Sequence, residues 1–505
     1  MAENEIEDAE LAAQTETGCD IEINVAREEA AWYSIMNVLA LSLGSGMGIP
    51  LDDAECDQAA DWAGMSWRDL PTINPLPLKG IFKSGDPHLV TPFEQMNLEY
   101  WRWNPDSFDR SLVPQAQGWT ILSECECARS FAMSQSSEGL PDDVRNQWKA
   151  LAMFFYTLAR QQCDFAINNL RNDQGLFITS SEFGSVRITN EATNLEDQAC
   201  MLWACSDLAL MAKQPNSIFA DESSKECFVT FADRLFEDVW AAKDMLLDTS
   251  LNKILAQSVA IPALIWYSCA TEAHDLRARC FWTLREFADN LVKAEEANEM
   301  VGDTLVDAAA ALRALVDAFR VTRLNTYAET SVKIFNYIES QWSKTGVYAP
   351  TPLATEYTFN ADDIGIILGA LNASRLFLKA RIDRELAELR MRVFFCKAVN
   401  MSGLQMSMPS MDFLPEWIQQ REPELHFRHS ICPLPSEVEL APVFAGEVSY
   451  DPQSDTWSRN AIFDSPAAMH ACCELLWLSE AINGFPEVSL AEAPVAVRQA
   501  AGMEG

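Results

Sequence analysis

Amphipathic helical periodicity recurs along almost the whole chain, and it is the feature that most limits how the chain can fold. Apolar residues return at helical spacing, and no stretch has the polar–apolar alternation that a large sheet needs. The sequence therefore predicts an all-α fold of long helices. The predicted helices cover 26–44, 114–133, 144–170, 194–213, 222–247, 251–272, 274–297, 302–321, 325–343, 360–379, 382–400 and 465–483.

These predicted helices are of two alternating kinds. One kind is small and apolar, as in "ADDIGIILGALNASRLF" (361–377), and is typical of a helix covered on all sides. The other kind carries charge along one face, as in "HDLRARCFWTLREFADNLVKAEE" (274–296), which is typical of a helix with one face in water. The alternation predicts an inner ring of helices enclosed by an outer ring.

A short unit that connects a charged helix to an apolar one occurs twice. "NDQGLF" (172–177) is followed after a polar loop by "NLEDQA" (194–199). "SKTGVY" (343–348) is followed in the same way by "NADDIG" (360–365). Such internal repetition indicates that one supersecondary unit, here a helical hairpin, is used several times.

The starts of the apolar helices carry capping signals. Asn194 and Asn360 are predicted N-caps, and each is followed at the third helical position by an aspartate, Asp197 or Asp363. Ser465, with a proline directly after it, is the predicted cap of the last helix.

The repeated units and the inner–outer pairs resemble the (α/α)6 toroid of six-hairpin glycosidase-like proteins. The resemblance covers most of residues 26–483 and matches no particular enzyme family. It implies six inner and six outer helices, with loops leading into the inner helices forming a rim around a ligand funnel. The predicted divisions are a disordered acidic N-terminus (1–22), one toroid domain (23–487) with long loops at 48–113 and 401–464, and a disordered tail (488–505).

Charge and composition restrict the compartment and the partners. The net charge of -37 opposes binding to nucleic acid and to anionic membranes. No run of 18 apolar residues is present, and the N-terminus lacks a basic, apolar leader, so we expect a cytoplasmic protein without membrane insertion. Most of the 14 cysteines fall in apolar helical patterns and are interpreted as reduced core thiols.

Aromatic side chains in the loops are candidates for saccharide contacts. The resemblance implies a carbohydrate-active enzyme, either a glycoside hydrolase or a sugar epimerase or isomerase, acting on a small neutral saccharide in the funnel. Trp101, Trp103, Tyr348 and Tyr357 are the candidate stacking residues, because the C–H face of a sugar packs on an aromatic ring. The alternative is that these rings pack the loops onto the helices.

Carboxylates at the rim are candidates for acid–base chemistry. Glycoside hydrolysis needs one protonated and one ionised carboxyl group near the scissile bond. Glu356 and Asp363 are the candidate acid and base, and Asp197 is a candidate substrate-binding residue. For Asp197 and Asp363 there is a structural alternative, since a carboxylate at a helix N-terminus is stabilised by the helix dipole.

Two of the five histidines lie in "ELHFRHSIC" (424–432), within the long 401–464 loop. His429 and His470 are candidate proton-transfer groups for an epimerase. His426, His429 and Cys432 also form a candidate site for Zn or Cu, because imidazole and thiolate suit these metals. The alternative function is therefore a non-catalytic toroid that binds a metal ion or a protein partner through the 401–464 loop.

Overall fold

The computed structural model describes residues 19, 21–63, 76–90, 102–135, 141–183, 186–298, 301–350, 354–408, 433 and 438–478. Within these residues the predicted mainly helical fold is confirmed. The predicted helix positions agree closely with the observed ones, because core-facing apolar residues recur through each helix and polar side chains cap several of the N-termini.

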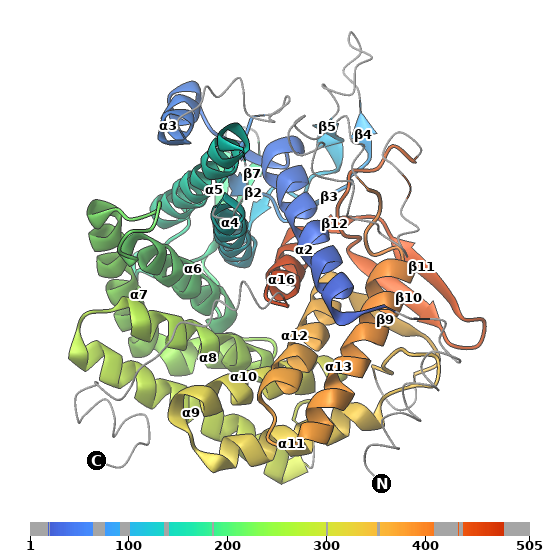
Figure 1. Ribbon diagram of the computed structural model, residues 1–505. Helices are drawn as coiled ribbons and strands as arrows, with labels where there is room; N and C mark the ends of the chain where they lie inside the picture. Colours follow the sequence, from blue (N-terminus) through green and yellow to red (C-terminus); the bar gives the residue numbers. More distant parts are fainter. Residues whose placement is uncertain are drawn as a thin grey trace.

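Six helices contact one another in a closed cycle, called here the inner ring. Its members are α4 (Pro114–Gln135), α6 (Leu195–Lys213), α8 (Lys253–Ala270), α10 (Leu305–Thr322), α12 (Ala361–Phe377) and α16 (Ser465–Leu476). Each packs against the next in this order, and α16 returns to pack against α4. Figure 1 shows the six helices of the inner ring arranged around a common centre.

Each inner-ring helix is backed by an outer helix that contacts it directly. The outer helices are α5 (Asp142–Asn169), α7 (Glu222–Thr249), α9 (His274–Asn298), α11 (Asn325–Ser340), α13 (Arg381–Phe395) and α2 (Ile23–Leu39). They cover α4, α6, α8, α10, α12 and α16 in that order (Figure 1). The first outer helix of the chain thus packs on its last inner helix, which joins the two ends of the described fold.

Two outer helices end in π-helical turns. α2 continues into η1 (Ala40–Gly44), and α13 continues into η5 (Cys396–Met401). A further helix, α3 (Asp53–Ala63), contacts α5 and lies in the region predicted as loop 48–113. Its first turn carries Asp53 and Glu55, whose charge is favourable at a helix N-terminus.

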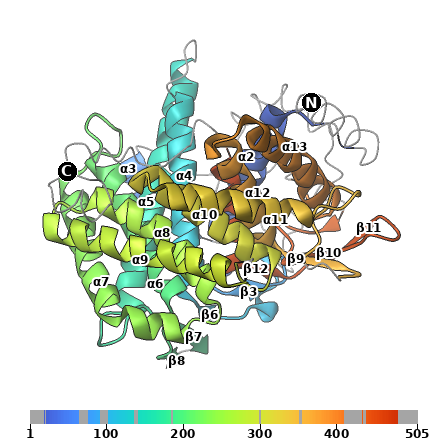
Figure 2. The same ribbon diagram turned by 90° about the horizontal axis from the view of Figure 1, so that it is seen from below.

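Short strands form small antiparallel sheets, so the prediction of helices alone is incomplete. The strands are β1 (Gly48–Pro50), β2 (Leu78–Ile81), β3 (Ser84–Gly85), β4 (Leu89–Val90), β5 (Arg102–Trp103), β6 (Ser111–Leu112), β7 (Thr179–Phe183), β8 (Val186–Asn190), β9 (Tyr357–Asn360), β10 (Glu447–Asp451), β11 (Thr456–Asn460) and β12 (Phe463–Asp464). The pairs join loops that are distant in sequence, as in β6–β7–β8, β9–β10–β11 and β3–β12. Several strands run straight into inner helices, and Figure 2 shows them gathered at one end of the inner ring.

Caps define where the inner helices begin at this end. The Asn194 side chain accepts a hydrogen bond from the Asp197 amide at 2.8 Å, and Asn360 with Asp363 forms a capping box, as predicted. The predicted cap at Ser465 is wrong by one residue. Asp464 is the cap, and its carboxylate accepts a hydrogen bond from the Ala467 amide.

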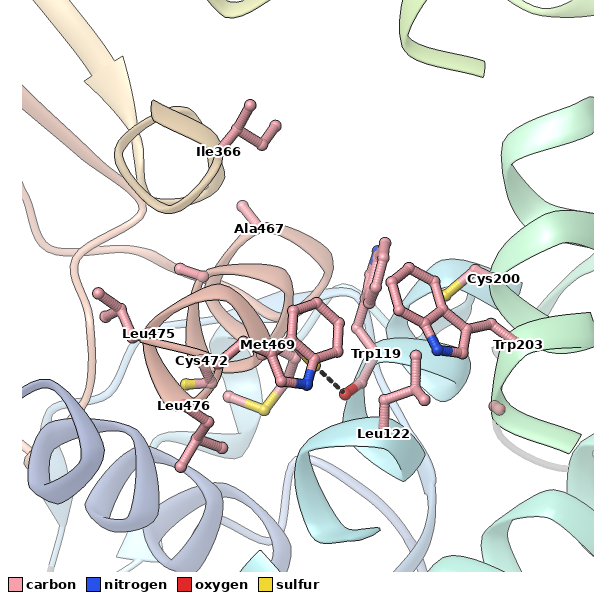
Figure 3. Close-up of a cluster of buried hydrophobic side chains, with 14 of the residues drawn as sticks. Trp119, Leu122, Cys200, Trp203, Ile366, Ala467, Met469, Cys472, Leu475 and Leu476 are labelled. Atoms are coloured by element: carbon pink, nitrogen blue, oxygen red, sulfur yellow. Dashed lines mark hydrogen bonds between the residues drawn. The ribbon is translucent and has the colours of Figure 1, made fainter. Parts of the chain in front are cut away.

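The helix α8 is the most apolar of the inner ring. Among the described residues it is the one helix long and apolar enough to cross a membrane, but 78% of it is buried inside the structure. Its contacts with α6, α9 and α10 account for this apolar composition. The apolar core continues around the ring, and Figure 3 shows Trp119 of α4 beside Trp203 of α6, with Met469 of α16 in the same cluster.

Candidate functional site

Charged side chains occur in the middle of otherwise apolar inner helices. Arg313 of α10 forms an ion pair with the Glu474 carboxylate of α16, and both groups are largely shielded from solvent. One helical turn further along α10, Asp317 accepts a 3.3 Å hydrogen bond from Arg320. Burying a charge costs free energy unless it is paired, and each carboxylate here has its own arginine.

Indole rings lie beside these charges. The rings of Trp203 and Trp477 are stacked, with centroids 4.9 Å apart and planes 8° apart. The Arg313 guanidinium lies 4.8 Å from the Trp477 ring, in cation–π geometry. The Trp266 ring lies 6.4 Å from Trp203 and continues the aromatic surface onto α8.

A small cavity of about 60 Å³ lies between these groups. Its walls come from the middle and second half of the inner helices, away from the strands that lead into them. The lining residues are Trp203, Pro262, Trp266, Arg313, Asp317, Arg320, Gly369, Asn372, Ala373, Leu376, Phe377, Glu474 and Trp477. Among the described residues, this cavity therefore lies away from the loop rim at which the sequence predicted the site.

One oxygen of Glu474 is available within this site. Its Oε1 atom faces Arg313, whereas Oε2 is buried without a hydrogen-bond partner among the described residues. Oε2 occupies the space that a side chain at Gly369 would fill. A buried carboxylate oxygen without a hydrogen-bond partner destabilises the folded protein, and a hydroxyl group of a bound ligand would offset this cost by donating a hydrogen bond.

A second charged cluster lies behind Trp477. Arg129 of α4 is paired with both Glu126 and Asp207, and the indole Nε1 of Trp477 donates a 3.1 Å hydrogen bond to Glu126. Burial raises the pKa of Glu126 to about 7, although Arg129 opposes the shift. Glu126 therefore holds Trp477 in place and changes protonation near neutral pH.

His470, a predicted proton-transfer residue, lies next to this site. Its ring stacks on Trp119 at 3.9 Å and 10°, and its Nε2 is 3.5 Å from the Glu474 carboxylate. Burial, together with the charge of Arg313, lowers the pKa of His470 to about 3. The imidazole is therefore neutral at physiological pH and is placed to orient Glu474.

The carboxylates predicted at the rim lie at the other end of the inner helices. Asp363 accepts a 2.9 Å hydrogen bond from the Asn360 amide, and burial raises its pKa to about 6. Asp197 has its pKa raised to about 7, first by burial and then by Glu196. Asp363 completes a capping box, whereas the Asp197 carboxylate accepts a 2.9 Å hydrogen bond from the side chain of the cap residue Asn194. Glu356 is exposed in a bend before β9. None of these three residues lines the cavity.

Three of the predicted stacking residues are within the described part of the chain, and the structure buries all three. Trp103 packs edge-on against Phe463, with ring centroids 5.0 Å apart. Tyr348 is fully buried, and its hydroxyl donates a 3.0 Å hydrogen bond to Glu339. Tyr357 packs on Tyr450 within the β9–β10 pair. Contrary to the expectation that these rings face a funnel, each is buried against other side chains: Trp103 and Tyr357 pack between strands, and Tyr348 packs on Phe394 of α13.

The predicted metal site lies outside the described residues. His426, His429 and Cys432 are all among the residues that the structure does not describe. The same holds for Trp101 and for the predicted disordered ends, except Cys19, Ile21 and Glu22. Within the described part, no three His, Cys, Asp or Glu side chains come together as a metal-binding group.

Sequence reasoning missed the residues that do line the cavity. Arg313 and Asp317 stand in "DTLVDAAAALRALVDAF", and Glu474 stands in "MHACCELLW". A lone charge within an apolar helix was the available signal, since burial of that charge requires a partner or a ligand.

Sequence comparisons give no family for this chain. It matches no model of a known protein family, and no curated protein is significantly similar to it.

Proposed function

We propose that the chain is an (α/α)6 toroid of the six-hairpin glycosidase-like type and a carbohydrate-active enzyme, with its site in the central cavity. The observation that carries this proposal is the unpartnered Glu474 oxygen in a cavity that combines indole rings with arginine-paired carboxylates. The fold part rests on the closed inner ring, in which each helix is backed by its own outer helix.

The lining of the cavity favours a neutral saccharide. Arg313 is paired with Glu474 and Arg320 with Asp317, so the walls carry no net charge when Asp317 is ionised and one positive charge when it is protonated. A highly charged ligand therefore gains little attraction. Indole faces suit the apolar side of a sugar ring, while Asn372 and Glu474 suit its hydroxyls. The 60 Å³ volume holds roughly four to six waters, so one edge of a sugar enters it and the remainder lies at the mouth.

The two carboxyl groups differ in a way that suits glycoside hydrolysis. Burial raises the pKa of Asp317 and favours its protonated form, while the ion pair with Arg313 favours ionised Glu474. In this proposal Asp317 donates a proton to the leaving oxygen, and Glu474 acts as the base or nucleophile. The isomerase alternative is weaker, because His470 is shielded by Trp119 and does not line the cavity.

A saccharide panel with matched variants tests the proposal. We expect one class of neutral oligosaccharide to raise the unfolding temperature and to be hydrolysed. Glu474→Gln and Asp317→Asn should each abolish hydrolysis, while Glu286→Gln, on the outer helix α9 and paired with Lys243, should leave it unchanged. If the wild type binds no saccharide, or if folded Glu474→Gln keeps full activity, the proposed site is wrong.

A further inference from the structure

Three sulfur atoms come together where the N-terminal segment lies against α13. The Cys19 Sγ is 3.9 Å from the Met401 Sδ, and the Cys19 thiol also forms a hydrogen bond with the Cys396 thiol. Both cysteines are buried, whereas the Met401 side chain is 39% exposed. The three residues come from two segments that are nearly 400 positions apart in sequence.

The backbone on both sides holds this arrangement. Cys396 and Met401 are the first and last residues of the π-helical turn η5. A π-helix forms hydrogen bonds between residues five apart, so positions 396 and 401 lie closer to one face of η5 than they would in an α-helix. On the N-terminal side, the Ile21 carbonyl accepts a 2.6 Å hydrogen bond from Arg392 Nε.

We propose that Cys19, Cys396 and Met401 form a binding site for Cu(I). Two thiolates and a thioether are soft ligands, which select Cu(I) among the biological metals. A structural zinc site takes four nitrogen or sulfur ligands, and this cluster supplies three sulfurs. The exposed Met401 gives the ion a route from solvent to the buried thiols.

Binding is balanced in protons and charge. Cu(I) displaces one proton from each thiol, so two protons are released and the copper keeps its oxidation state. The bis-thiolate complex then carries one negative charge. Lys397, which follows Cys396 in η5 and is paired with Asp455, acts on the Cys396 thiol and offsets this charge in part. This site is separate from the central cavity and does not depend on the proposed enzymatic function.

Competition with a coloured Cu(I) chelator, under anaerobic reducing conditions, tests the site on the full chain. We expect the wild type to withhold one equivalent of copper from the chelator. Cys19→Ser and Cys396→Ser should each lose that equivalent, and Met401→Leu should weaken it. Cys227→Ser, at an exposed thiol on α7, is the matched control and should keep it. X-ray absorption should show sulfur ligands only.

Two results would overturn the proposal. One is equal copper retention by the wild type and the Cys19→Ser variant, which would place the metal on other thiols. The other is reduced protein that retains no copper, together with a Cys19–Cys396 disulfide in protein purified without reductant, which would make the pair a redox crosslink. Because Cys19 is buried, the unfolding temperature of its serine variant is measured alongside, and copper retention is compared at a temperature at which both proteins are folded.

Discussion

Gly369 lies directly against Glu474, so a β-carbon at position 369 would overlap the carboxylate Oε2 and come within 3.1 Å of Arg313 Nη1. The missing side chain on α12 therefore makes room for the ion pair between α10 and α16. A single glycine in this way connects three inner-ring helices to the chemistry of the cavity.

The first prediction concerns this glycine. Gly369→Ala should destabilise the protein by about 1–3 kcal/mol, because a methyl group is inserted into a filled site next to a charged pair. It should also abolish saccharide binding. Gly44→Ala is the control, since a β-carbon there meets nothing within 4 Å. Urea unfolding measures the stability of the two variants. Equal stability of Gly369→Ala and Gly44→Ala would contradict the observed packing.

The second prediction concerns the indole stack. Trp203→Ala removes a buried ring that packs on Trp119 and Trp477, and it should cost about 3–5 kcal/mol of unfolding free energy. Trp282→Ala removes a ring that is 55% exposed on α9, and its effect should stay within about 0.5 kcal/mol. Denaturant unfolding followed by circular dichroism separates the two. A small effect of Trp203→Ala would mean that the indole stack contributes little to the stability of the inner ring of helices.

The helices were predictable from sequence because their signals are local. Apolar periodicity and polar caps within one helix fix where α6 or α12 begins, and Asn194 and Asn360 act as predicted. The strands were missed because β6 or β12 is two residues long and exists through a partner loop distant in sequence. Such pairing leaves almost no alternation pattern in either segment.

The candidate site was less predictable because it depends on which helix faces meet. Asp197 and Asp363 follow the predicted caps Asn194 and Asn360, and their place in the first helical turn explains each carboxylate without any ligand. The pairing of Arg313 with Glu474 joins residues far apart in the chain. Only the closed packing of α10, α12 and α16 brings them together, and no local pattern specifies that packing.

The third prediction concerns the pH dependence that Glu126 imposes. Its pKa is about 7 in the folded protein and near 4.5 when unfolded, so the folded state binds the extra proton between these values. Stability contributed by this group is therefore lost as pH rises from about 4.5 to about 7. Glu126→Gln should remove that loss and be more stable than the wild type by about 1–3 kcal/mol at pH near 8.

Two comparisons check this assignment. Asp244→Asn, at an exposed carboxylate on α7, should leave the pH profile of unfolding unchanged. The Glu126→Gln amide keeps the size of the side chain and leaves the pair between Arg129 and Asp207 intact. A variant that is less stable than the wild type at every pH would show that Glu126 contributes as an ion, contrary to the prediction.

The fourth prediction concerns His470, whose folded pKa of about 3 lies below the ordinary value of 6.5. The unfolded chain binds a proton below pH 6.5 and the folded chain does not, so this residue lowers stability as pH falls from about 6.5 towards about 3. His470→Phe keeps a ring against Trp119 and removes the titration, and it should lose less stability than the wild type on acidification. The direct measurement is the ¹⁵N chemical shift of the imidazole, which should stay constant from about pH 5 to 8. A midpoint near 6.5 would show that the ring is hydrated, and it would remove His470 as a neutral partner that orients Glu474.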